Sequence, residues 1–167
     1  MQDLAPHIIL LTAARSVLLF PITLVGLYRG ENMHRTYGIP GHGRYTVFRD
    51  TIQLREAWRD VTPMILVIGF RLRWIKSNRF FHWLFQRVCI ITTPFWSGLI
   101  GFKEKLWMVD RITKEYLGIY QWLGERPARY YIAFLIPILR IFSLSRSIWY
   151  TVVPATPLNR YLLQNTN

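Results

Sequence analysis

The stretch YYIAFLIPILRIFSLSRSIWYTVV, residues 130–153, decides what fold the sequence predicts. It is long enough to cross a bilayer as one helix, because about 20 apolar residues span the hydrocarbon core. It also contains Arg140 and Arg146, and a charged side chain inside a membrane span is costly unless it is neutralised. We therefore predict a transmembrane helix whose arginines contact lipid phosphates or the carboxylates of a partner.

Two other apolar stretches also contain an internal arginine. In residues 7–28, the favourable free energy of inserting the apolar side chains into a membrane exceeds the cost of inserting Arg15. This balance predicts another transmembrane helix. Residues 80–102 contain Arg87 and are interrupted by Pro94. This break favours a re-entrant helix, with a third crossing as the alternative.

The segments between these stretches are basic or amphipathic. Residues 29–79 are rich in Lys and Arg, which places them on the matrix side of an inner membrane. Within them we expect a loop over residues 36–45 and a helix over residues 47–61. Residues 103–129 predict an amphipathic helix ended by Gly124 and Pro127. Its apolar stripe recurs every three or four residues: Leu106, Val109, Ile112, Tyr116, Tyr120 and Leu123.

We find no alternating strand pattern of useful length. The sequence therefore predicts one all-α, membrane-embedded subunit. Two transmembrane helices, or three in the alternative, combine with amphipathic and interfacial helices.

The composition indicates an anionic partner. The 167-residue chain carries a net charge of +12, and 16% of its residues are aromatic. Only four of its 21 basic residues are lysines, and arginine binds phosphate and carboxylate in a bidentate way that lysine cannot. This excess of arginine over lysine fits two kinds of partner: an anionic phospholipid such as cardiolipin, and the acidic side chains of partner subunits. It fits nucleic acid less well.

Basic and aromatic side chains alternate most densely over residues 70–87, and this mixture suits a layer of lipid headgroups. The alternative is that these arginines reach the membrane surface or pair with acids on neighbouring subunits. The predicted lipid- or partner-binding residues are Arg15, Arg71, Arg73, Trp74, Lys76, Arg79, Arg87, Arg140 and Arg146.

No motif points to catalysis, a cofactor or a metal. The four histidines show no metal-ligand spacing, and Cys89 is the only cysteine. The glycine-rich residues 38–44 lack the Gly-Lys-Ser/Thr ending of a phosphate-binding loop.

The sequence thus predicts a non-catalytic accessory subunit of an oxidative-phosphorylation complex in the mitochondrial inner membrane. ATP synthase is slightly preferred over the respiratory complexes. The alternatives are an organellar ribosomal or RNA-binding protein, and a small membrane enzyme or carrier.

Overall fold

The computed structural model describes Leu11, Ala14, Leu18 and residues 27–53, 62–73, 78–97, 99 and 101–165. Its centre is a seven-stranded sheet in which every pair of neighbouring strands is antiparallel. The all-α prediction is therefore wrong.

Six elements form a βαββαβ unit. They are β4 (Pro63–Phe70), α3 (Arg79–Ser97), β5 (Phe102–Val109), β6 (Tyr116–Leu123), α4 (Glu125–Phe142) and β7 (Trp149–Pro154). The four strands lie in the order β5-β6-β4-β7, which is the topology of a ferredoxin-like fold. β1 (Leu27–Arg29), β2 (Thr36–Ile39) and β3 (Gly43–Gln53) extend the sheet beyond β5, while η1 (Ser145–Ser147) precedes β7 and α5 (Leu158–Gln164) follows it.

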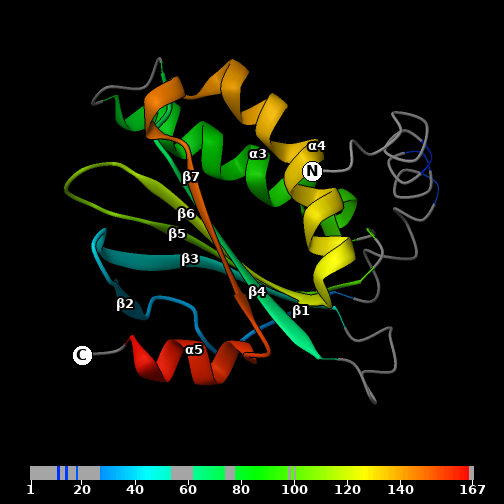
Figure 1. The fold of residues 1–167 in the computed structure, drawn as a ribbon. Coiled ribbons are helices and arrows are strands. Elements are labelled where there is room, and N and C mark those ends of the chain that lie inside the picture. The colour runs from blue at the N-terminus through cyan, green and yellow to red at the C-terminus, as the bar shows by residue number, and fades with distance from the viewer. Residues whose placement is uncertain are drawn as a thin grey trace.

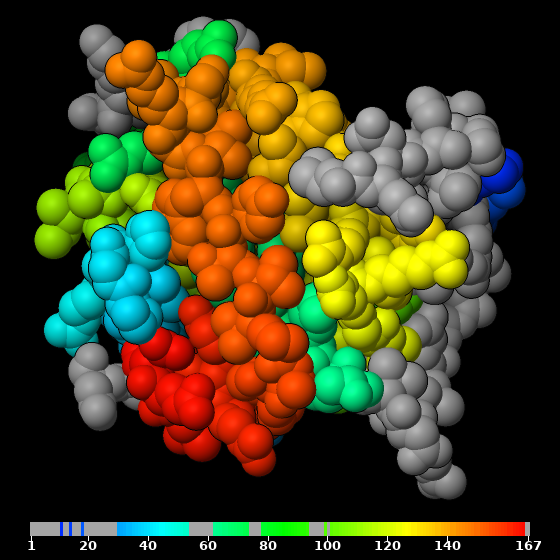
Figure 2. Space-filling view, in the orientation of Figure 1, coloured from blue at the N-terminus to red at the C-terminus, as the bar shows by residue number. Residues whose placement is uncertain are grey.

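Both faces of the sheet are covered. Figure 1 shows α3 and α4 over one face, with α5 on the other side. In β4, Leu66 and Ile68 pack beneath the two long helices, while Ile65 and Val67 belong to a second core with β2 and α5. Figure 2 shows α5 and the edge strand β7 next to each other on the visible surface. A strand buried on both sides needs apolar residues at every position, which explains why β4 lacks an alternating pattern.

Residues 103–129 form the β5–β6 hairpin and the start of α4, instead of the predicted amphipathic helix. The chain reverses at Asp110, whose Oδ1 accepts hydrogen bonds from the backbone N–H groups of Ile112 (2.7 Å) and Thr113 (3.1 Å). Such an aspartate favours a turn over a helix. Ile112, part of the predicted stripe, is 91% exposed at this turn.

The stretch from 130 to 153 is divided between α4 and β7. α4 buries one face, formed by Ala128, Tyr131, Leu135 and Leu139, so its apolar residues pack on the sheet. Gly124 and Pro127 mark its start and not the end of a preceding helix, because proline is tolerated in a first turn. The helix ends at Phe142, and β7 then pairs with β4 at the sheet edge.

None of the described helices has the length and apolarity that a membrane crossing requires. Arg87, Arg140 and Arg146 are all exposed, although each is internal to an apolar stretch of the sequence. Arg87 and Arg140 lie on the outer sides of α3 and α4, and Arg146 lies in the short helix η1. The predictions of a mitochondrial inner-membrane location and of an accessory subunit of an oxidative-phosphorylation complex are wrong. The predicted helix over residues 7–28, including Arg15, lies almost wholly outside the described residues.

Candidate functional site

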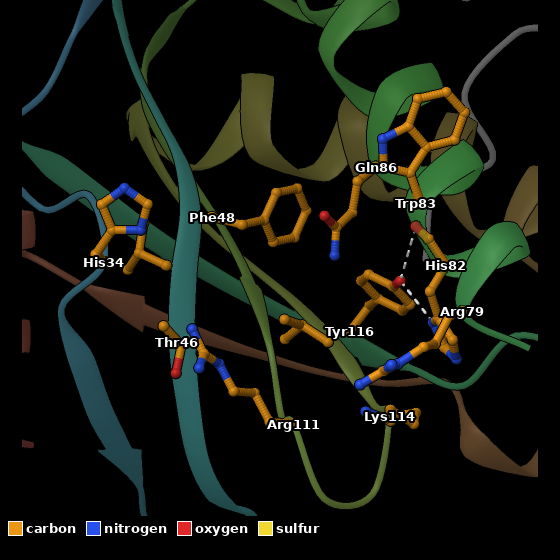
Figure 3. Close-up of a pocket in the computed structure, with 12 residues that line it drawn as sticks. His34, Thr46, Phe48, Arg79, His82, Trp83, Gln86, Arg111, Lys114 and Tyr116 are labelled. Carbon is orange, nitrogen blue, oxygen red and sulfur yellow. Dashed lines mark hydrogen bonds between the residues drawn. The ribbon is translucent and has the colours of Figure 1, made fainter. Parts of the chain in front are cut away.

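A pocket of about 570 Å³ lies between α3, β3 and the turn that joins β5 to β6. Figure 3 shows the side chains that converge on it from these elements. Its lining comprises His34, Thr46, Val47, Phe48, Arg79, His82, Trp83, Gln86, Val109, Arg111, Lys114 and Tyr116.

The first turns of α3 form one wall. Asn78 precedes the helix, and its Oδ1 accepts a hydrogen bond from the backbone N–H of Phe80 at 2.9 Å. This cap fixes where the helix starts and therefore where Arg79 and His82 lie. The N-terminal end of a helix carries a partial positive charge, which favours an anion nearby.

The β5–β6 turn supplies two cations. Its backbone closes between Asp110 and Glu115, where the N–H of Asp110 donates to the Glu115 carbonyl at 2.9 Å. Lys114 has a φ of 59°, a left-handed conformation that tightens the reversal. The turn brings the side chains of Arg111 and Lys114 to the pocket.

An irregularity in β3 shapes the opposite wall. The pairing of β3 with β5 shifts register between Val47 and Arg49, and such a bulge redirects the side chain at that point. Phe48 therefore faces the pocket, where its ring meets Tyr116 edge-on with centroids 6.2 Å apart. His34 joins the same wall because its N–H donates to the Val47 carbonyl at 2.9 Å.

His82 and Tyr116 form a hydrogen-bonded pair in the pocket, with 2.8 Å between His82 Nδ1 and the Tyr116 hydroxyl oxygen. Burial raises the pKa of Tyr116 above its ordinary value of 10.0, although a hydrogen bond with Gln86 opposes the change. Tyr116 is therefore neutral at physiological pH and can both donate and accept a hydrogen bond. The pair can orient a polar group of a ligand or exchange a proton with it.

The described charged side chains that line the pocket are all basic. Arg79, Arg111 and Lys114 line it, and none of its described lining residues is a carboxylate. In Figure 3, Arg79 and Lys114 lie near each other below Tyr116, Arg111 lies across the pocket beside Thr46, and Trp83 lies above the rings of Phe48 and Tyr116. The site thus offers both positive charge and aromatic surface. This arrangement suits an anionic group attached to a planar or apolar body.

Of the predicted binding residues that the structure describes, only Arg79 lines this pocket. Arg71 instead pairs with Glu115 within the chain, with its Nε 3.0 Å from Glu115 Oε2. The same carboxylate accepts hydrogen bonds from Tyr45 (3.0 Å) and Trp149 (2.9 Å), so it joins β3 and β7 to the residue that follows β4.

The other candidates do not meet at one site. Arg73 Nη2 donates to the Arg140 carbonyl at 3.3 Å, near the end of α4. Arg87 lies over the Trp83 ring on α3, while Arg146 is exposed in η1. Trp74 and Lys76 fall outside the described residues.

Sequence reasoning missed most of the pocket. Its described members come from four separated stretches of the sequence, and only the fold brings them together. A partial signal existed in Asp110-Arg111-Ile112-Thr113-Lys114, where an aspartate turn carries two cations.

No protein-family model and no curated protein matches the chain. A solved structure from Listeria monocytogenes is similar in fold, and it is described as an uncharacterized ferredoxin fold protein related to antibiotic biosynthesis monooxygenases. The two share 12% sequence identity, with a TM-score of 0.46, over 85% of this chain and 89% of that one. A likeness at this level assigns no substrate or chemistry to the present chain. The prediction of a non-catalytic membrane subunit is wrong, because it depended on an all-α membrane fold and the described residues form a ferredoxin-like α/β fold.

Proposed function

We propose that this protein binds a small organic anion with an aromatic or apolar body in the pocket between α3 and the β5–β6 turn. The observation that carries the proposal is that Arg79, Arg111 and Lys114 line an aromatic pocket whose described lining lacks a carboxylate. Guanidinium groups bind carboxylates and phosphates through paired, charge-assisted hydrogen bonds.

The size of the pocket agrees with a small ligand. Its volume of about 570 Å³ falls in the range typical of small-molecule sites. The rings of Phe48 and Trp83 would contact the apolar part of the ligand. The His82–Tyr116 pair would then hydrogen-bond a polar substituent, and it is the group best placed to move a proton on a bound substrate.

Isothermal titration calorimetry with matched ligands tests the proposal. Phenyl phosphate and 2-naphthoate carry the anionic group, whereas benzyl alcohol and 2-naphthalenemethanol keep the ring and lack the charge. We expect the anions to bind and the alcohols to bind at least about tenfold more weakly, because a charge-assisted hydrogen bond contributes roughly 1.5–3 kcal/mol.

Arg111→Ala should weaken anion binding by about tenfold and leave the alcohols unaffected. Arg160→Ala, at an exposed position on α5 behind the sheet, is the matched control and should change neither. Equal affinity for anions and alcohols, or equal loss in both variants, would contradict the proposal.

A further inference from the structure

The outward side of α3 is apolar where a surface helix is normally polar. Eight of residues 79–93 are exposed, and six of these are large hydrophobic residues. Ile91 is 68% exposed and Phe80 60% exposed, while Cys89 and Thr93 face inward and are buried. The exposed apolar residues, here called the α3 face, are Phe80, Phe81, Trp83, Leu84, Val88 and Ile91.

The charge on and around this face is positive. Arg79 and Arg87 lie among its apolar side chains, and residues 79–93 contain no Asp or Glu. The Arg87 guanidinium carbon lies 5.3 Å from the centroid of the Trp83 ring. A cation held over an aromatic ring keeps its charge beside the apolar surface, because the ring's electrons attract it.

The end of α4 extends the same surface. Figure 1 shows α4 beside α3 on one side of the sheet. The backbone N–H of Arg73 donates to the Phe142 carbonyl at 2.9 Å, and this contact ties the end of α4 to the segment that leads into α3. Ile141 and Phe142 are exposed there beside the exposed Arg140. Aromatic and aliphatic side chains thus alternate with arginines over both helices.

We propose that the α3 face docks the protein on an anionic phospholipid surface, as a peripheral contact. Aromatic rings favour the boundary between headgroups and acyl chains, and guanidinium groups bind lipid phosphates. An apolar helix side bearing arginines can lie in this boundary without crossing the bilayer. The net charge of +12 would draw the whole chain toward such a surface.

Charge argues for lipid over a second copy of the chain. Two α3 faces brought together would juxtapose Arg87 with the arginines of the other copy, with no carboxylate among residues 79–93 to neutralise them. A phospholipid surface supplies the missing negative charge at the depth where the aromatic side chains bind. This proposal does not depend on the ligand of the pocket, although Arg79 and Trp83 border both surfaces.

Vesicle co-sedimentation of the full chain tests the proposal. The vesicles contain phosphatidylcholine alone or mixed with phosphatidylglycerol. We expect binding to the anionic vesicles that weakens in high salt, because exposed charges are screened. Arg87→Glu and the double variant Phe80→Ser/Ile91→Ser should each reduce this binding by about tenfold or more. None of these three residues lines the pocket.

Arg160→Glu and Leu163→Ser are the matched controls. Both residues are exposed on α5, on the other side of the sheet from α3, and should leave vesicle binding unchanged. Circular dichroism would verify that every variant keeps the wild-type fold.

Vesicle binding that the α3 variants do not reduce would overturn the proposal. Two further results would do the same. One is loss of self-association in the α3 variants without loss of vesicle binding. The other is binding to poly(U) RNA that exceeds binding to anionic vesicles and is lost in the same variants.

Discussion

Replacing Glu104 by glutamine should make the protein more stable above neutral pH. Glu104 on β5 is 8% exposed and pairs with Ile52 on β3. Asp50, two residues earlier on β3, is completely buried. Burial raises the pKa of Glu104 from its ordinary value of 4.5 to about 7, and the nearby charge of Asp50 adds to the rise.

The direction of the pH effect follows from proton binding. Between about pH 4.5 and 7 the folded state holds a proton on Glu104 that the unfolded chain has released. The stability contributed by that proton is complete below pH 4.5 and is lost as the pH rises through about 7. A change in pKa of this size corresponds to at most about 3 kcal/mol.

Glutamine stays neutral at every pH, so the variant should avoid this loss. We expect Glu104→Gln to match the wild type within roughly 0.5 kcal/mol near pH 4 and to exceed it by about 1–3 kcal/mol near pH 8. Urea unfolding across this range measures the difference. Glu125→Gln, at an exposed position on α4, is the control and should change the free energy of unfolding by less than about 0.5 kcal/mol. If the curves of Glu104→Gln and wild type run parallel from pH 4 to 8, the proposed buried proton does not exist.

Three further substitutions test the packing. Glu115→Gln removes the ion pair with Arg71 and should lower the free energy of unfolding by about 1–2 kcal/mol in urea, whereas the exposed Arg129→Gln should cost less than about 0.5 kcal/mol. Gly69→Ala would drive a methyl group into the Trp149 ring and should lower stability by about 1–3 kcal/mol; an unchanged Tm would contradict this packing. Burial lowers the pKa of Lys105 from 10.5, so folding opposes its charged form, although the Trp107 ring lies 2.9 Å from its Nζ. Lys105→Met should therefore stabilise the protein at neutral pH, and a gain that failed to shrink as the pH approached 10.5 would refute the argument.

The sequence identified where apolar residues gather but not what they pack against. Residues 80–102 were predicted to be helical in either membrane arrangement, and the structure has α3 over Arg79–Ser97. A long apolar helix and an amphipathic helix packed on a sheet have similar composition, so α4 was read as part of a membrane span. The arginines inside the apolar stretches led to the wrong prediction of buried, neutralised charges. Arg87 and Arg140 are internal to those stretches in sequence and yet exposed on their helices.

The strands were missed for two physical reasons. β4 is covered on both faces, so Ile65 and Leu66 are equally buried and no alternation marks the strand. In the β5–β6 hairpin, apolar residues happen to recur at helical spacing, although Ile112 is exposed at the turn. The pocket was beyond sequence reasoning because it depends on how these strands bring Arg111 and the residues of α3 around one cavity.

The central claim is that the pocket beside α3 binds an organic anion, and NMR mapping tests where that anion binds. Titrating 2-naphthoate into ¹⁵N-labelled protein should shift the backbone amides of His34, Thr46, Arg111 and Lys114, which surround the pocket. Amides of α5 behind the sheet, such as those of Arg160 and Leu163, should stay unchanged. Shifts confined to the exposed side of α3 or to α5, with none in the β5–β6 turn, would contradict the account.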